Sequence, residues 1–303
     1  MNNLATTSPI TIVMASDNFY AILLAPLLKS IEVNHKTGEK LDFFILDDNI
    51  SLKNKRKLEA TIDPTCSRLN WIKAEDIIFQ DIKIPVDKTA FPPTAYLRLF
   101  APYAIPSDRD RLIYLDVDML MLDDISNLWN LDTANRAFGA VQDLQEIVSC
   151  AWGGVPNYEE LGIPADSKYF NSGMLLINVK KWKADQVTRK VIQCLIDNKE
   201  YVNWVDQYGL NAAMANQWQE LDKRWNWYAT KADRLPDGQL PSIVHFLDVK
   251  PIFKSYASNK TFQTEFYNYM KLTPWKNHQP ISDYVRIMRK AYNKIKKKLG
   301  QLS

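Results

Sequence analysis

Short apolar runs alternate with longer segments of helical periodicity along the first half of the chain. Runs typical of buried strands cover residues 9–15, 41–46, 67–72, 111–115 and 137–142. Between the first two, residues 21–33 carry apolar side chains at three- and four-residue spacing, and further on Ser51 can cap a helix that reaches Leu58. Strands that alternate with helices in this way predict an α/β protein, with a mostly parallel, doubly wound sheet flanked by helices.

A loop-rich stretch opens the second half of the chain. Residues 151–164 are rich in Gly and Pro, an apolar run over residues 169–178 follows, and residues 185–197 have a helical pattern. No internal repeat or low-complexity linker divides this region. We therefore expect one domain over residues 9–255 and a helical extension over residues 256–303.

Aspartates lie at or near the expected carboxyl ends of three strands, where open α/β sheets bind their ligands. They are Asp17, Asp116 and Asp143. Asp118 follows Asp116 by two residues inside an apolar segment. In a strand this spacing places both carboxylates on one face, about 7 Å apart along the backbone. Such a pair is costly to bury unless a cation neutralises it, and carboxylate oxygens suit Mg²⁺ or Mn²⁺. The alternative is a strand that ends in solvent, with both carboxylates hydrated.

The composition narrows the class of protein. The chain has 303 residues, of which 46% are hydrophobic and 24% charged, and it contains no run of 18 apolar residues. Residues 1–8 lack the basic and apolar segments of a secretory signal. The cysteines (Cys66, Cys150 and Cys194) are far apart and odd in number, which argues against a disulfide framework or a cysteine zinc site. These features predict a cytoplasmic protein.

The positive charge of the chain is concentrated in its last twenty residues. From residue 284 onward there are seven Lys or Arg residues and no acidic residue. Apolar residues recur there at three- and four-residue spacing (Tyr284, Ile287, Met288, Ala291, Ile295 and Leu299). A basic amphipathic helix over residues 283–299 predicts peripheral contact with an anionic membrane surface. The alternative is a helix packed on the body of the protein. No nucleic-acid recognition motif is present, so we expect no nucleic-acid partner.

A few further residues supply candidate chemistry around the acid pair. No glycine-rich phosphate loop occurs, so the phosphates of a nucleotide would need a metal or basic side chains. His245 follows a short apolar run and is a third candidate metal ligand, with a nitrogen that favours Mn²⁺ over Mg²⁺. Lys250 and Arg98 are candidate phosphate partners. A core histidine and a helix-surface arginine are the alternative interpretations.

Six short motifs follow one another along the chain. They are residues 15–18, 94–99, 114–118 and 169–178, Asp206-Gln207, and His245 followed by Lys250-Pro251. In these motifs and their order, from residue 10 to residue 255, the chain resembles glycosyltransferase family eight, which includes glycogenin and bacterial lipopolysaccharide galactosyl- and glucosyltransferases. The resemblance implies a GT-A fold, with a Rossmann-like sheet, and a UDP-sugar donor. It also implies Mn²⁺, with Mg²⁺ as the alternative, and retaining transfer of galactose or glucose to a saccharide or glycolipid acceptor.

The resemblance also implies a role for each matched residue. The implied metal ligands are Asp116, Asp118 and His245. The implied donor-binding residues are Ala15, Asp17, Arg98, Asp116, Asp143, Asn171 and Lys250. The implied catalytic residues, beside the anomeric carbon of the donor, are Asp206 and Gln207.

Three positions depart from the family pattern. Phe19 and Ile252 stand where relatives usually have Asn and Trp, and Asp248 stands where they usually have Gly. These departures leave a second interpretation open, in which an inactive GT-A scaffold binds a sugar nucleotide or acts as a membrane adaptor. A haloacid-type phosphohydrolase is a third, because such enzymes also carry Asp-x-Asp. Retention is compatible with double displacement and with front-face attack, and the sequence leaves both open. The neutral amide of Gln207 is a poor nucleophile and the Asp206 carboxylate a better one, but Asp206 can instead bind the hydroxyl groups of the sugar, so we lean toward front-face attack.

Overall fold

The computed structural model describes residues 8–82 and 93–300, and for residues 93, 289, 290, 293, 294 and 296–300 it describes the backbone alone. The strands are β1 (Ile10–Asp17), β2 (Leu41–Asp48), β3 (Ser67–Lys73), β4 (Arg111–Leu115), β5 (Met119–Met121), β6 (Phe138–Ile147), β7 (Lys168–Asn178), β8 (Gln219–Glu220), β9 (Trp227–Tyr228) and β10 (Ile243–His245). The α-helices are α1 (Ala21–Asn34), α2 (Leu52–Glu59), α3 (Ala74–Ile77), α4 (Ile125–Trp129), α5 (Val179–Ala184), α6 (Val187–Asp197), α7 (Asp206–Ala213), α8 (Lys260–Met270) and α9 (Asp283–Gly300). Two 3₁₀ helices are η1 (Pro93–Tyr103) and η2 (Lys223–Asn226).

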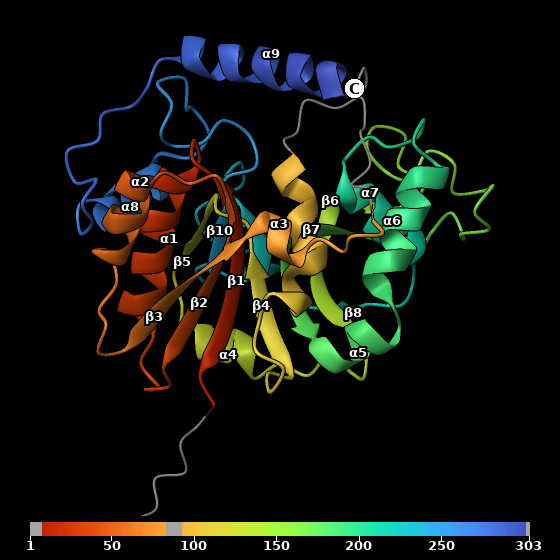
Figure 1. The fold of residues 1–303 in the computed structure, drawn as a ribbon, viewed down its shortest axis with the longest axis horizontal. Coiled ribbons are helices and arrows are strands. Elements are labelled where there is room, and N and C mark those ends of the chain that lie inside the picture. Colours follow the sequence, from red (N-terminus) through yellow and green to blue (C-terminus); the bar gives the residue numbers. More distant parts are fainter. Residues whose placement is uncertain (1–7, 83–92, 301–303) are drawn as a thin grey trace, which may run out of the picture.

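The central sheet has seven strands in the order β3-β2-β1-β4-β7-β6-β8 (Figure 1). Six of these strands run in one direction, and β7 runs against its neighbours β4 and β6. The predicted mostly parallel sheet is therefore confirmed, whereas the reversal of β7 was not predicted. Because β7 is reversed, its first residues lie at the same edge as the carboxyl ends of β4 and β6.

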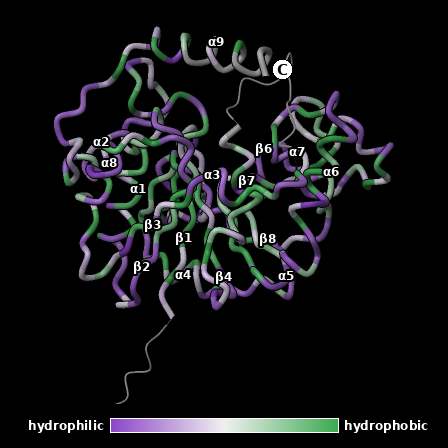
Figure 2. The backbone as a smooth tube through the Cα atoms, viewed as in Figure 1, coloured by the Kyte–Doolittle hydropathy of each residue, from purple (hydrophilic) through white to green (hydrophobic). Residues whose placement is uncertain are grey.

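Each face of the sheet is buried under a separate apolar layer. Side chains alternate along β1, so Ile12 and Met14 enter the core beneath α1 and α8, while Val13 and Ala15 enter the core beneath η1, α6 and α7. Figure 2 shows the hydrophobic colouring concentrated on the central strands and on the helices next to them. The predicted cap of α2 is confirmed, because the Ser51 side chain accepts a hydrogen bond from the Asn54 amide. Such a cap contributes about 1 kcal/mol.

The last fifty residues form two elements with different surroundings. Phe262, Phe266, Met270 and Trp275, on and just after α8, are buried in the same core cluster as α1. The domain boundary at residue 255 stays a prediction. Helix α9 lies along the side of the molecule toward which β1 runs (Figure 1), and its large apolar side chains that the structure describes are exposed. Among the residues that the structure describes, no helix is both long enough and apolar enough to cross a membrane.

Candidate active site

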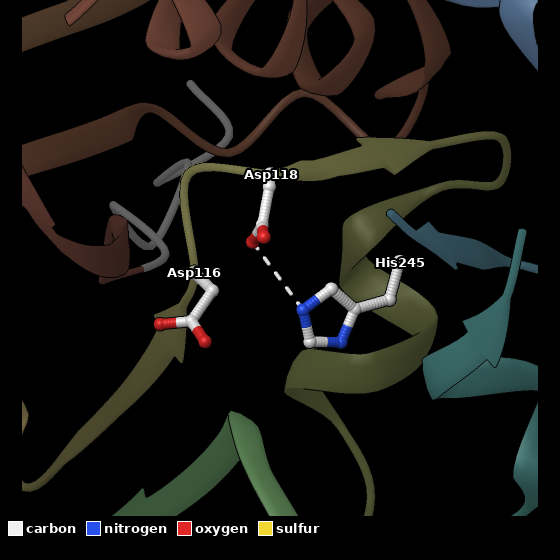
Figure 3. Close-up of side chains that lie close together, drawn as sticks. All are labelled: Asp116, Asp118 and His245. Atoms are coloured by element: carbon white, nitrogen blue, oxygen red, sulfur yellow. Dashed lines mark ion pairs between the residues drawn. The ribbon is translucent and has the colours of Figure 1, made fainter. Parts of the chain in front are cut away.

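The two carboxylates and the imidazole of the predicted metal site lie together (Figure 3). Ligand atoms of Asp116, Asp118 and His245 are all within 4.8 Å of one another. The Nε2 atom of His245 is 3.3 Å from Oδ1 of Asp118. Two hard oxygen ligands with one imidazole nitrogen suit Mn²⁺, and suit Mg²⁺ less well because it prefers oxygen. The donor set therefore fits a divalent cation.

A turn, rather than a strand, holds the acid pair. Asp116 and Asp118 lie between β4 and β5, so the expectation that strand spacing sets both carboxylates on one face is wrong. The Asp116 amide donates to the carbonyl of Gly173 in β7 at 2.8 Å, and the Phe246 amide donates to the carbonyl of Asp118 at 2.9 Å. Backbone contacts on both sides thus fix the turn and bring its two carboxylates together.

A second, three-stranded sheet brings the imidazole to this turn. Its order is β5-β10-β9, and the antiparallel pairing of β5 with β10 sets His245 opposite Met119. This register places the histidine beside Asp118, the residue that precedes Met119. The His245 residue is only 2% exposed, and its other ring nitrogen, Nδ1, is 2.9 Å from Oδ1 of Asn226.

Two cations balance the acidic groups in this structure. The Lys250 ammonium group forms an ion pair with Asp118. Arg98, from η1, has its Nη2 atom 3.0 Å from Oδ1 of Asp116 and its Nε atom 2.8 Å from Oδ2 of Asp206. The guanidinium also lies over the ring of Tyr114, with its carbon 5.0 Å from the ring centroid. Arg98 is thus buried as a bridge between two carboxylates.

These surroundings shift the carboxyl pKa values of Asp116, Asp118 and Asp206 differently. Burial raises the pKa of the Asp116 carboxyl, and Arg98 opposes this rise without cancelling it. Burial acts on Asp118 in the same direction, but Lys250 and His245 outweigh it and hold the pKa of Asp118 well below its usual range. Burial raises the pKa of Asp206 to about 6, against the effect of Arg98. Asp118 is therefore the most strongly ionised of the three.

The acid pair divides a cleft into two compartments. The larger compartment has a volume of 480 Å³ and the smaller one 220 Å³. Residues that line both are Ala95, Arg98, Asp116, Asp118 and Lys250. The smaller compartment also contains Ala15, Asp17, Tyr20 and Thr94. The larger one also contains Asp143, Asn171, Asp206, Gln207, Trp152 and Trp204. All eleven residues predicted for the site therefore line this cleft, and Arg98, Asp116, Asp118 and Lys250 lie where its two compartments meet.

A buried hydrogen-bond network forms the floor of the larger compartment. Gln207 Nε2 donates to Oδ2 of Asp143 at 2.8 Å, and its Oε1 accepts from Asn171 Nδ2 at 3.2 Å. The Tyr228 hydroxyl donates to Oδ1 of Asp143 at 2.7 Å. Asp143 lies within β6 rather than near its end, beside a shift in the pairing of β6 with β7. Such irregularities re-aim side chains next to active sites.

The segment before Asp206 has an unusual backbone. Val205 has a φ of 52°, which is strained for a β-branched residue. It immediately precedes α7, whose first two residues are Asp206 and Gln207. The strained residue turns the chain so that both side chains of this pair enter the cleft.

Asp17 has a local structural role at the end of β1. Its Oδ1 atom accepts hydrogen bonds from the amides of Phe19 and Tyr20, each at 2.9 Å, and these fix the turn into α1. The ring of Phe19 packs against Phe253, with their centroids 6.3 Å apart. Phe19, which stands where relatives usually have Asn, is therefore part of the packing around this turn.

Asp248 and Ile252, the other two residues that depart from the family pattern, lie in one loop but differ in burial. Asp248 is exposed and lines the larger compartment, so it adds a negative charge there. Ile252 is buried in the core beneath α1. Sequence patterns alone do not distinguish these two environments, because both residues belong to the same irregular segment after β10.

Several residues that hold the site together were not predicted from the sequence. Asn226 contacts both His245 and Asn171, and the Ser172 hydroxyl accepts a hydrogen bond from Arg98 Nη1 at 3.0 Å. Asn226 stands between Trp225 and Trp227, and nothing in the sequence around it marks it as a residue of the site. Ser172 lies inside a motif, yet its partner is 74 residues away.

Comparisons with known proteins agree with this architecture. The model of the family described as Glycosyl transferase family 8 matches residues 11–254. General stress protein A of Bacillus subtilis (strain 168) is 28% identical over 280 residues, which cover 87% of this chain and 94% of that protein. Lipopolysaccharide 1,2-glucosyltransferase of Escherichia coli (strain K12) is 27% identical over 198 residues, covering 61% of this chain and 56% of that protein.

Solved structures share the fold. The galactosyltransferase LgtC, in complex with donor and acceptor sugar analogues, superposes with a TM-score of 0.72 at 24% identity, over 89% of this chain and 100% of that one. The bifunctional glycosyltransferase WbbM superposes with a TM-score of 0.73 at 20% identity, over 92% of this chain and 53% of that one. The GT-A fold expected from the sequence is confirmed. The chain is a glycosyltransferase and belongs to glycosyltransferase family 8.

Proposed function

We propose that this protein transfers a hexose, galactose or glucose, from a UDP-sugar to a saccharide or glycolipid acceptor, with retention at the anomeric carbon. The proposal rests on one observation above all. A cleft with a smaller and a larger compartment has two aspartates of the candidate metal site and two cations where the compartments meet, and His245, the third candidate ligand, lines the larger compartment. That arrangement suits a nucleoside in one compartment, a sugar in the other, and a diphosphate between them.

The donor would lie across this cleft. Ala15 and Asp17 line the compartment proposed for uridine, and Lys250 and Arg98 stand where the diphosphate would pass. Asp116, Asp118 and His245 would hold Mn²⁺, or Mg²⁺ in its place. A bound divalent cation would stabilise the negative charge that develops on the departing diphosphate. Asp143 and Asn171 would accept and donate hydrogen bonds to the hydroxyl groups of the donor sugar.

The state of the catalytic pair supports front-face attack over double displacement. Both ends of the Gln207 amide are already hydrogen-bonded, to Asn171 and Asp143. The Asp206 carboxylate is ion-paired with Arg98 at 2.8 Å. The charge of Arg98 lowers the nucleophilicity of the Asp206 carboxylate, and the Gln207 amide is a weak nucleophile that is already hydrogen-bonded at both ends. We therefore assign Asp206 and Gln207 to orienting the sugar, with the leaving phosphate accepting the proton of the acceptor hydroxyl.

The outer part of the larger compartment suits a saccharide acceptor. Trp152 and Trp204 line it and remain 63% and 37% exposed. Leu144 and Leu247 line it too and are also exposed. Aromatic faces bind the apolar face of a sugar ring, so this edge of the cleft is where the acceptor would stack.

Helix α9 supports a peripheral membrane location, on the inner face of the plasma membrane. Its side chains Tyr284, Ile287, Met288 and Ile295 are each more than half exposed. Its sequence supplies seven cationic residues from Arg286 onward. An exposed apolar stripe with cationic neighbours fits an anionic bilayer. The helix lies on the side of the molecule toward which β1 runs, the side where the site lies (Figure 1), which would bring a glycolipid acceptor near the cleft.

A panel of UDP-sugars tests the proposed activity. The protein is incubated with Mn²⁺ and each UDP-sugar in turn, and slow hydrolysis and binding are measured. Hydrolysis of UDP-galactose or UDP-glucose, with release of the α-configured sugar and loss of activity in Asp116→Asn, is the expected result. UDP binding without hydrolysis of any UDP-sugar would favour the inactive scaffold instead. Release of phosphate from simple phosphomonoesters would favour the phosphohydrolase.

A further inference from the structure

We propose that Asn226 is a positioning residue that keeps a proton on Nδ1 of His245 and leaves the Nε2 lone pair for the metal. The inference rests on the proposed metal site. It concerns which ring nitrogen of His245 is free to bind the metal, and the hydrogen bonds of the protein itself determine this. Asn226 lies at the end of η2 and is 3% exposed, so water does not compete for its amide group.

A backbone amide fixes the direction of the hydrogen-bond chain. The amide N–H of Gly173 donates to Oδ1 of Asn171 at 3.0 Å, and a backbone N–H has no alternative role. The side-chain oxygen of Asn171 is therefore the atom that faces Gly173. The same oxygen is 2.8 Å from Nδ2 of Asn226, so Asn226 must present its NH₂ group there.

The orientation of the Asn226 amide then determines which ring nitrogen of His245 carries the proton. With its NH₂ group on Asn171, Asn226 presents Oδ1 to Nδ1 of His245, at 2.9 Å. An oxygen acceptor in that position requires a proton on Nδ1. The competing partner is Asp118, which is 3.3 Å from Nε2 and would attract a proton to that atom. Its charge is already shared with Lys250, and its contact with the ring is the longer of the two. The chain therefore favours Nδ1–H.

The same chain joins the metal ligand to the sugar compartment. Asn171 Nδ2 donates to Oδ2 of Asp143 and to Oε1 of Gln207, both at 3.2 Å. Asn171 thus uses its oxygen toward the histidine and its nitrogen toward the groups proposed to bind the donor sugar. Rotation of either amide would break contacts on both sides. Asn226 accordingly connects the geometry of the metal ligand to that of the sugar-binding residues.

Nitrogen NMR of the full-length protein tests this assignment directly. The chain has three histidines, His35, His245 and His278, so ¹⁵N-histidine labelling gives a short spectrum that single His→Gln variants at positions 35 and 278 assign. Long-range ¹H–¹⁵N spectra are recorded at pH 9, with and without Mg²⁺ as a diamagnetic probe. We expect Nδ1 of His245 to carry the proton in both. A spectrum in which Nε2 carries it, with Nδ1 unprotonated, overturns the proposal.

Two substitutions of equal size separate positioning from simple packing. Asn226→Asp still offers an oxygen to Nδ1, so it should keep the proton there. Asn226→Leu offers none, so Nε2–H should become the main form and Mn²⁺ affinity, measured by calorimetry, should fall 10- to 100-fold. An unchanged tautomer in Asn226→Leu overturns the proposal. If that variant does not fold, Asn226→Asp and the wild-type spectrum still decide the question. Nδ1–H in the wild type without any Mn²⁺ binding would reject the proposed metal site but not the tautomer assignment.

Discussion

The Nε atom of Arg98 lies 2.8 Å from a carboxylate oxygen of Asp206, and both side chains are more than nine-tenths buried. The other end of the guanidinium contacts Asp116, so one cation serves an acid of the proposed metal site and an acid of the proposed catalytic pair. The guanidinium is planar and extended, so its charge lies beside both carboxylates at once, whereas the ammonium of lysine is a compact point charge. Arg98 therefore connects the proposed metal site with the proposed catalytic pair.

Replacement of this arginine should damage both stability and turnover. Arg98→Met leaves two buried carboxylates without their cation, a change that typically costs about 3–5 kcal/mol. Arg98→Lys restores the charge at one carboxylate only, so it should recover stability in part and still lower kcat/KM for UDP-sugar hydrolysis by about 100-fold. Thermal unfolding and steady-state kinetics measure the two effects.

An exposed ion pair provides the control for Arg98. Arg189 and Asp81 form such a pair at 2.7 Å, with both side chains at least half exposed. Arg189→Met should change the free energy of unfolding by at most about 1 kcal/mol and leave hydrolysis unchanged. Equal effects of Arg98→Met and Arg189→Met would mean that the buried bridge is unimportant.

Asp206 should make stability depend on pH in an identifiable window. Burial raises the pKa of its folded form to about 6, above the value of about 3.9 for an unfolded chain. Between those values the folded state binds the extra proton, so this residue's contribution to stability falls as pH rises from 4 to 6. Asp206→Asn removes the ionisation. Its stability relative to the wild type should therefore rise by about 3 kcal/mol from pH 4 to pH 7, as measured by urea unfolding. A difference between the two proteins that does not change with pH would contradict the raised pKa.

The negative charge of Asp248 should weaken donor binding. The residue lines the larger compartment together with Lys250, which is a proposed partner of the diphosphate. Repulsion between two exposed like charges costs up to about 1 kcal/mol in water. Asp248→Asn removes the repulsion between this carboxylate and the diphosphate, so it should tighten binding of UDP in the presence of Mn²⁺ by roughly 2- to 5-fold. Calorimetric titration measures the change.

A carboxylate at the opposite edge of the sheet serves as the control for Asp248. Asp108 precedes β4 and its side chain is 77% exposed. Asp108→Asn makes the same change in net charge and should leave UDP affinity unchanged. If both variants tighten binding equally, the effect of Asp248 comes from net charge and not from its place in the cleft.

The exposed face of α9 should bind anionic vesicles. Ile287 and Ile295 are 59% and 57% exposed. The double substitution Ile287→Glu with Ile295→Glu places two negative charges on this face, so sedimentation with phosphatidylglycerol vesicles should fall at least about tenfold. UDP-sugar hydrolysis in solution should not change. Val33→Glu, at the end of α1, alters an apolar residue of comparable exposure elsewhere and should sediment like the wild type.

The parts of this molecule that the sequence predicts are those set by local patterns. The β4 strand has the predicted bounds, because its apolar run is uninterrupted between polar residues. The direction of β7 was not predicted, because an apolar run of ten residues reads the same in either direction. The eleven residues predicted for the site all line one cleft, whereas the turn geometry of Asp116 and Asp118 depends on backbone contacts with β7 and with the residue after β10.

The features that were not predicted from the sequence depend on contacts between residues far apart in the chain and on locally strained backbone. The hydrogen bond between Asn226 and Asn171 joins residues 55 positions apart, one at the end of η2 and the other in β7. Val205 is unremarkable in composition, and its left-handed backbone is imposed by the structure around it. Sequence patterns report periodicity and residue type, and neither property specifies these distant or strained arrangements.

Binding of Mn²⁺ in the presence of UDP tests the central claim most directly, which is that Asp116, Asp118 and His245 hold the cation that receives the diphosphate. Calorimetric titration of the wild-type protein should give one Mn²⁺ site per chain, with an affinity that UDP increases. Asp118→Asn keeps the size of the side chain and removes the charge, so Mn²⁺ affinity should fall at least about 100-fold while thermal unfolding shows a folded protein. Unchanged Mn²⁺ affinity in Asp118→Asn, or UDP binding that a chelator does not weaken, would contradict the account.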